Sequence, residues 1–139
     1  MTTALRTGSA RSVTNQTALG ISGYRTAVRA GALVVDIRSR AQRERQGVLA
    51  GAVEARPAVD LLDPRSGSAL AAVDGRRSVI LVSDDGLDAE LFALELRFRG
   101  VGGVRAVDGG FDALRAAGAL ALLSEAAHLL RERSAIAAH

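Results

Sequence analysis

A short segment between an apolar run and a helix contains the residues best suited to chemistry. Ser83 follows the run Val79–Val82, two acidic residues come next, and Gly86 and Asp88 lead into the helix. Enzymes present nucleophiles and bound anions on loops of this kind, because free amides at a helix N-terminus attract negative charge. The candidate active-site loop is therefore Ser83, Asp84, Asp85, Gly86, Leu87 and Asp88.

The residue types in the chain exclude most kinds of catalysis at this loop. The chain has no cysteine, and all 18 of its basic residues are arginine. This composition rules out thiol nucleophiles, thiolate metal sites, Schiff bases and the lysine of a P-loop. The only histidines, His128 and His139, lie near the C-terminus, so we expect neither a histidine metal site nor a serine–histidine pair with Ser83.

The three aspartates of the loop offer hard oxygen ligands, but their pattern does not favour a metal. Asp84, Asp85 and Asp88 lack the spacing of a calcium-binding loop, and acidic turns of this kind are usually solvated. We expect no metal and no other cofactor. The same carboxylates disfavour a bound anion, since at an effective dielectric of about 20 one such charge about 4 Å away costs about 4 kcal/mol before screening.

The charge pattern does not indicate a nucleic-acid or membrane ligand. The net charge is +3, and the densest basic cluster, Arg38 to Arg45, is interrupted by Glu44. We interpret this cluster as a solvated loop and helix edge. No apolar stretch approaches the roughly 18 residues of a membrane span, and no secretory signal follows the first basic residue. We expect a cytoplasmic protein that binds neither nucleic acid nor membrane.

Apolar runs separated by glycines predict alternating strands and helices after a flexible arm at 1–18. Strands are expected at Ala32–Asp36, Ala52–Glu54, Val79–Val82 and Val104–Val107, and the very apolar third run is expected to be central. Helices are expected at 24–30 with Ser22 as the N-cap, at 68–73, from Asp88 as N-cap to Arg99, around Leu114, and at 119–138.

Two of the expected helices carry apolar faces. In the helix after the loop, Leu87, Leu91, Leu94 and Phe98 recur three and four residues apart, and we predict that they form one buried stripe. In the C-terminal helix, leucines and alanines between 120 and 130 form a broad face that packs on the domain or receives a partner. Packing on the domain is the commoner arrangement for a terminal helix.

This alternation predicts an α/β fold, in which helices flank both faces of a parallel sheet and a C-terminal helix is added. Functional groups in such folds lie at the carboxyl ends of the strands. Ser83 occupies one strand end, and Asp36 and Arg38 occupy another.

Four separated motifs make the chain resemble a single rhodanese domain. They are Val-Asp-Ile-Arg at 35–38, Gly-Val-Leu-Ala-Gly-Ala at 47–52, the run and loop at 79–86, and Asp-Gly-Gly-Phe-Asp-Ala-Leu at 108–114. The resemblance covers residues 19–118, which we take as the domain, with a C-terminal helix at 119–139. It implies that Asp36 and Arg38 form a structural pair, and that the fold is supported by Gly51, Gly109, Gly110 and Phe111.

The same resemblance puts Ser83 where the family carries a cysteine. In the family, the thiolate of that cysteine takes up a sulfane sulfur as a persulfide, and the loop amides stabilise it. A serine alcohol is a far weaker acid than a thiol, whose pKa is about 8.5, and it cannot carry a persulfide. We therefore predict that Ser83 occupies the nucleophile position without being a nucleophile for sulfur.

Two hypotheses about function remain open. In the first, the chain is a rhodanese-like domain without sulfurtransferase activity that acts as a binding or regulatory module. Its protein partner would bind the loop face or the helix at 119–139, and a homodimer through that helix is one such arrangement. In the alternative, the natural protein is a thiosulfate or persulfide sulfurtransferase whose cysteine at position 83 has been replaced by serine.

Overall fold

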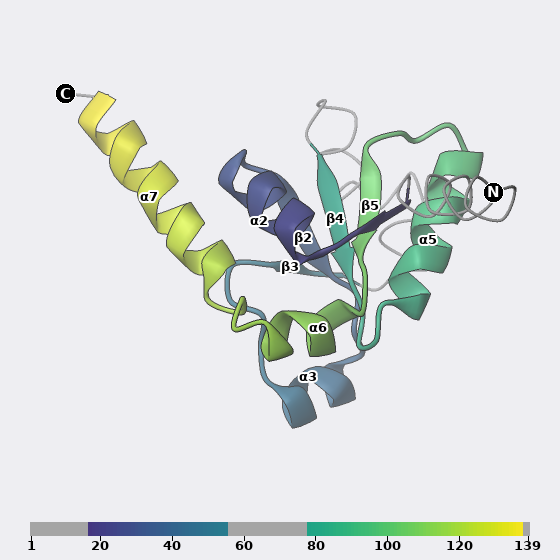
Figure 1. The fold of residues 1–139 in the computed structure, drawn as a ribbon. Helices are drawn as coiled ribbons and strands as arrows, with labels where there is room; N and C mark the ends of the chain where they lie inside the picture. Colours follow the sequence, from purple (N-terminus) through teal and green to yellow (C-terminus); the bar gives the residue numbers. More distant parts are fainter. Residues whose placement is uncertain (1–16, 56–77, 138–139) are drawn as a thin grey trace, which may run out of the picture.

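The computed structural model describes residues 17–55 and 78–137, without the side chains of 127, 130 and 134–137. The expected helix at 68–73 and nearly all of the expected arm lie outside these ranges. The elements in chain order are β1 (Ala18–Leu19), α2 (Ile21–Arg29), β2 (Leu33–Asp36), α3 (Arg40–Gln46), β3 (Val53–Glu54), β4 (Val79–Val82), α5 (Leu87–Phe98), β5 (Val104–Val107), α6 (Gly110–Ala116) and α7 (Leu122–Ala137) (Figure 1).

A parallel sheet of five strands, in the order β1-β5-β4-β2-β3, organises the described residues. β4 is the middle strand and all four of its residues are buried, which confirms the prediction of a central strand at Val79–Val82. The short strand β1, which pairs with β5, was not predicted. Two residues carry too little periodicity to be recognised as a strand.

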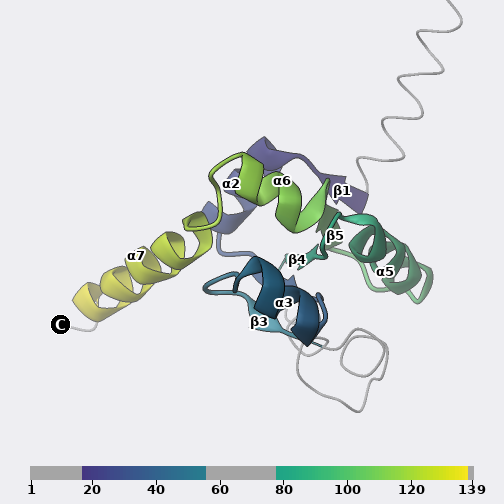
Figure 2. The same ribbon diagram turned by 90° about the horizontal axis from the view of Figure 1, so that it is seen from below.

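Alternate residues of the strands enter two separate apolar cores, as expected for a parallel sheet with both faces covered. Val34, Ile80, Val82 and Val107 pack with α2, α6 and the start of α7. The opposite face packs against α5, and the two layers are visible in Figure 2. The predicted α/β architecture with helices on both faces is confirmed. Within the first core, burial raises the pKa of the Tyr24 hydroxyl to about 12.

Helix α5 turns a different face to the sheet from the one predicted. Its buried residues are Ala89, Ala93 and Leu96, and the four residues of the expected buried stripe are exposed: Leu87, Leu91, Leu94 and Phe98. Both sets recur at three- and four-residue spacings, so helical periodicity alone does not distinguish them. The alanines decide the outcome, because their small side chains let the helix backbone lie close to the strands.

Two predicted N-caps are also wrong. Helix α2 begins at Ile21 after Gly20, and α5 begins at Leu87 after Gly86, and neither helix has a side-chain cap on its N-cap residue. Ser22 and Asp88 therefore lie inside the first turns of these helices. Before α5, Gly86 supplies the backbone turn with a φ of +93°, whereas Gly20 before α2 is extended with a φ of −73°.

Helix α7 packs on the domain through its beginning, where Leu123 belongs to the first core and Leu122 and Ala126 lie against it. Leu123 is buried over the turn at Gly51, where an added Cβ would meet Leu123 Cγ at 3.1 Å. Further along, His128, Leu129 and Arg133 are exposed, and the helix runs away from the rest of the molecule (Figure 1). Among the described helices, none is long and apolar enough to span a membrane.

The orientation of α5 predicts unequal effects for two leucine substitutions on the same helix. Leu96→Ala removes a fully buried side chain and should lower the free energy of unfolding by about 2–5 kcal/mol. Leu91→Ala removes a side chain that is mostly exposed and should change it by about 0.5 kcal/mol or less. Urea denaturation followed by circular dichroism measures both, and equal losses would contradict the observed orientation.

Candidate functional site

Ser83 lies at the carboxyl end of β4, with only 3% of the residue exposed. Its Oγ accepts two hydrogen bonds of 3.1 Å, from the backbone amides of Gly86 and Ala89. These amides belong to the loop and to the first turn of α5, where amides attract anions. The serine hydroxyl thus satisfies, inside the protein, two donors that would otherwise be free for a negatively charged group.

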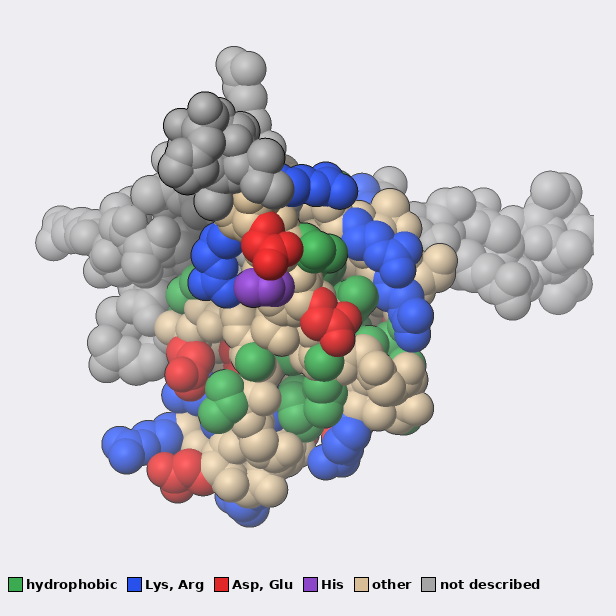
Figure 3. All heavy atoms as spheres, turned by 90° about the vertical axis from the view of Figure 1, so that its left-hand side faces the viewer, with side chains coloured by type: hydrophobic (Ala, Val, Ile, Leu, Met, Phe, Trp, Pro, Cys, Tyr) green, Lys and Arg blue, Asp and Glu red, His purple; other side chains and the backbone are tan. Residues whose placement is uncertain are grey.

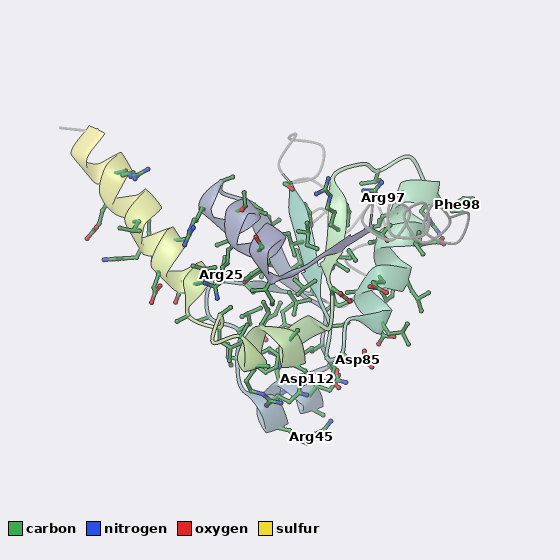
Figure 4. The ribbon with its side chains drawn as sticks, in the orientation of Figure 1. Arg25, Arg45, Asp85, Arg97, Phe98 and Asp112 are labelled. Carbon is green, nitrogen blue, oxygen red and sulfur yellow. The ribbon has the colours of Figure 1, made fainter. Side chains whose placement is uncertain are left out.

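Among the aspartates of the loop, Asp85 accepts a further hydrogen bond, and both Asp85 and Asp88 are exposed to solvent. Asp85 Oδ1 accepts a 3.0 Å hydrogen bond from the backbone amide of Leu87, the first residue of α5. Asp85 is exposed beside the start of the helix (Figure 4), and Asp88 is also exposed. A carboxylate of the chain itself therefore occupies the helix N-terminus, and it repels any external anion that approaches the loop.

The buried guanidinium of Arg38 joins several elements at the same end of the sheet. It donates to both carboxylate oxygens of Asp36, with 2.8 Å between Nη2 and Oδ2, and both side chains are almost fully buried. Nη2 also donates to the carbonyl oxygen of Gly47 at 2.9 Å. The Phe111 ring lies against the guanidinium, with its centroid 3.9 Å from Cζ. Such a set of contacts compensates for the desolvation of a buried charge.

Gln46 connects this arginine to the loop and was not identified from the sequence. Its Oε1 accepts from Arg38 Nη1 at 3.2 Å, and its Nε2 donates to Asp84 Oδ1. Gln46 is the last residue of α3, a helix that was not predicted as an element. The missed signal is the capping box of Ser39 and Gln42, whose side chains each bond the other residue's backbone.

Glycines hold the loop after β4 against the loop after β5. The amides of Phe111 and Asp112 donate to the carbonyls of Ser83 and Asp84, at 2.8 and 3.2 Å. Gly110 has a φ of +59°, and a Cβ added there would lie 2.3 Å from the Ser83 carbonyl oxygen. No other residue type fits this position without moving the loop. The glycine-glycine-phenylalanine motif thus supports the Ser83 loop directly.

The predicted arginine cluster is largely paired within the protein. Besides the Arg38 pair, Arg40 bonds Glu44 at 3.1 Å and Arg43 bonds Glu54. Arg45 is exposed on the outside of α3 (Figure 4). Next to the cluster, an open cavity of about 710 Å³ is lined by Ile37, Arg38, Ser39, Arg40, Gln42, Arg43, Ala55 and Asp88. The cavity therefore reaches the loop through Asp88 alone.

The described residues contain no group of three histidines or carboxylates that could hold a metal. His128 lies on α7, where it is exposed and within 3.1 Å of Glu132. It belongs to a part of the chain distant in sequence from Ser83, and none of its described contacts involves the loop. Within the described residues, Ser83 Oγ is hydrogen-bonded to the amides of Gly86 and Ala89 and not to His128, and His139 lies outside these residues.

The chain matches a protein-family model and several solved structures. The Rhodanese-like domain model matches residues 24–117. A protein of unknown function from Rhodopseudomonas palustris CGA009, described as a possible tyrosine phosphatase, is 24% identical over 78% of this chain and 86% of its own, with a TM-score of 0.65. No curated protein matches.

Two further solved structures are similar in fold. A rhodanese-related protein from Thermoplasma volcanium is 12% identical over 71% of this chain and 91% of its own, with a TM-score of 0.53. The Bacillus anthracis protein CoADR-RHD, solved in its reduced form, is 19% identical over 77% of this chain and 17% of its own, with a TM-score of 0.56. At these identities, the structures support the fold alone.

The contacts of Arg38 predict that a lysine cannot replace it. Arg38→Lys keeps the positive charge but loses the forked donors that reach Asp36, Gln46 and Gly47. We expect the free energy of unfolding to fall by about 3 kcal/mol or more, as for other broken buried pairs. Arg40→Lys, at an exposed pair, is the matched control and should change it by less than about 1 kcal/mol. Comparable losses in the two variants would contradict the central position of Arg38.

The two hydrogen bonds to Ser83 Oγ predict that this hydroxyl stabilises the loop. Ser83→Ala leaves the buried amides of Gly86 and Ala89 without that acceptor and should cost about 2 kcal/mol of unfolding free energy. Ser22→Ala, at an exposed residue in the first turn of α2, should be neutral or slightly stabilising. Urea denaturation tests both variants. A neutral Ser83→Ala would show that the hydroxyl is not needed to hold the loop.

Proposed function

The chain belongs to the rhodanese-like domain family, and we propose that it works as a binding or regulatory module without sulfurtransferase activity. The observation that carries this proposal is that side-chain oxygens of the chain itself accept the hydrogen bonds of the loop amides. Ser83 Oγ accepts from the amides of Gly86 and Ala89, and Asp85 Oδ1 accepts from the amide of Leu87. No thiol is present anywhere in the sequence to take up sulfur.

Sulfur transfer through Ser83 fails on chemical grounds. A persulfide requires a sulfur atom on the enzyme that attacks sulfane sulfur and then releases it, and an alcohol oxygen has neither the acidity nor the affinity for sulfur. A hydrolytic role for Ser83 would need a neighbouring base, and in the described part of the chain no histidine is among its hydrogen-bond partners. The site therefore lacks the thiol on which sulfur transfer depends.

The loop face is the surface that we propose for a protein partner. It combines the exposed carboxylates of Asp85 and Asp88 with the open cavity beside α3. Both lie at the carboxyl ends of the strands, where open α/β sheets bind their ligands. Rigid support from the Arg38 contacts and the glycine loops keeps this face preorganised, which lowers the entropic cost of binding.

One observation favours the alternative that the natural residue at position 83 is cysteine. Ser83 Oγ accepts from two loop amides at the strand end, which is where a thiolate would be stabilised. Gly86 and Gly110 keep the loop backbone in the tight arrangement around that position. The gene sequence decides between the two, because a serine codon at position 83 rules the alternative out.

The proposal predicts that the chain does not turn over thiosulfate and cyanide, as measured by thiocyanate formation. Ser83→Cys supplies a thiol and should give at most slow turnover, because Asp84 and Asp85 disfavour both a thiolate and an anionic substrate. Ser83→Cys combined with Asp85→Asn removes one charge and should be roughly two- to fivefold faster than Ser83→Cys alone.

The outcomes of this assay separate the two hypotheses. Clear turnover by the chain with Ser83 would overturn the proposal outright. Rapid turnover by Ser83→Cys, unaffected by Asp85→Asn, would show a loop still adapted to catalysis and would favour the cysteine alternative. Ser22→Cys serves as the control for the chemistry of an exposed thiol elsewhere on the domain.

A further inference from the structure

We propose that α3 is a detachable element that regulates the loop face, because the contacts that hold it on the described part of the domain are polar. When α3 detaches, Gln46 leaves Asp84, and the carboxylate of Asp84 is released to solvent or to a partner. The proposal rests on the proposed function in one respect, namely that the loop face is where a partner binds.

Helix α3 has no anchor in either apolar core. It lies entirely within the described residues, none of its seven residues is buried, and its one apolar residue, Ala41, is exposed. By contrast, α2, α5 and α6 each bury two or more residues. Helices this short are marginal in water unless an apolar face packs on the protein. The stability of α3 therefore depends on its polar contacts.

Two side chains of α3, those of Arg43 and Gln46, make these contacts. Arg43 donates to the carbonyl oxygen of Arg38 and pairs with Glu54 on the edge strand β3. Gln46 accepts from Arg38 Nη1 at 3.2 Å and donates to Asp84 Oδ1. About half of the Glu54 side chain is exposed, so water competes for its pair with Arg43. Water can replace each of these partners when α3 detaches, which keeps the net cost of breaking the contacts low.

The buried charge of Arg38 keeps its main partner when α3 detaches. Its guanidinium bonds Asp36 at 2.8 Å, and its backbone amide donates to Asp36 Oδ1 at 3.0 Å. Both residues belong to the end of β2, so these bonds do not require α3. The donors released are those to Gln46 and Gly47. Detachment therefore avoids the unpaired buried charge that makes broken buried pairs costly, and the strand end stays in place.

Open space lies on two sides of α3. The cavity of about 710 Å³ is lined in part by Gln42, and a second hollow, of about 340 Å³, is lined in part by Glu44 and Val48. Arg40 and Arg43 border both. Helix α3 lies at one end of the molecule (Figure 1), and Figure 3, in which this end is the lowest, shows basic and acidic side chains projecting there. The helix can therefore move outward without disturbing either core.

The contact between Gln46 and Asp84 links α3 to the loop in both directions. A partner group that binds the Asp84 carboxylate competes with Gln46 and favours the detached helix, and detachment favours that partner. Such coupling is reciprocal, because both events involve the same carboxylate. The partner of Asp84 within the described residues is a neutral amide, so a basic side chain of a partner protein is the group best suited to displace it.

Amide hydrogen exchange of the full chain, followed by NMR, tests whether α3 detaches independently of the domain. The α3 reporters are the amides of Arg43 and Gly47, which donate to the carbonyls of Ser39 and Arg43, and the sheet reporter is the amide of Ile37, which donates to Val82. Relative to intrinsic rates, we expect the α3 reporters to exchange at least about 100-fold faster than Ile37. Low urea should accelerate Ile37 alone, because detaching α3 exposes little surface. Equal protection and an equal response to urea would overturn the proposal.

Substitutions separate the detachment of α3 from unfolding of the whole domain. Leu96→Ala should accelerate exchange at Ile37 but not at the α3 reporters, because the core stays intact while α3 is detached. Gln46→Ala should accelerate the α3 reporters about five- to tenfold, although alanine favours a helix. Arg45→Ala, at an exposed neighbouring residue (Figure 4), is the matched control and should change them by less than about twofold. Faster α3 exchange in Leu96→Ala, or no change in Gln46→Ala, would contradict the proposal.

A double-mutant cycle tests the link between α3 and the loop. Asp84→Ala should accelerate the α3 reporters about fivefold, and adding it to Gln46→Ala should accelerate them by less than about a further twofold, because the two residues share one bond. Fully multiplicative effects would show that Gln46 and Asp84 act separately, and would overturn the regulation of the loop face. These measurements involve neither a partner nor sulfur transfer, so thiosulfate turnover would overturn the proposed function and leave the exchange results standing.

Discussion

The buried guanidinium of Arg38 is the contact on which the functional end of this domain depends. A charge in that position is tolerated only because its donors meet the Asp36 carboxylate, the Gly47 carbonyl and the Gln46 side chain, with the Phe111 ring against its face. These partners come from the end of β2, from α3 and the turn after it, and from α6. One side chain thereby joins the three segments that surround the Ser83 loop.

The loop around Ser83 is held by backbone contacts as well as by the serine hydroxyl. Backbone hydrogen bonds from Phe111 and Asp112, together with the close approach of Gly110, hold the strand ends together. The Ser83 hydroxyl accepts hydrogen bonds from the buried amides of Gly86 and Ala89, which would be costly to bury without a partner. Hydrogen bonds within the chain thus satisfy the buried donors of the loop.

Sequence patterns predicted the structure best in the strands, where every residue has the same apolar surroundings. The runs in β2, β4 and β5 were recognised because both faces of a parallel sheet are covered, so nearly every position must be apolar. The patterns predicted the structure least well where one pattern fits two orientations of a helix. Helix α5 has apolar residues at helical spacing on two faces, and only packing against the sheet selects Ala89, Ala93 and Leu96. Gln46 was missed because a glutamine in a polar helix carries no signal of its partners, although the capping box of Ser39 and Gln42 marks the helix itself.

The sequence by itself determined the architecture and the absence of a thiol. Order and spacing of apolar runs dictate a covered parallel sheet, and no conformation can supply a thiol to a chain without cysteine. The tertiary structure decided which groups satisfy the loop, which side of α5 faces outward and which residues join Arg38 to Asp84. These outcomes depend on distances between residues far apart in the chain, as for Gln46 and Asp84, which are 38 positions apart. Local periodicity and residue type carry no information about such distances.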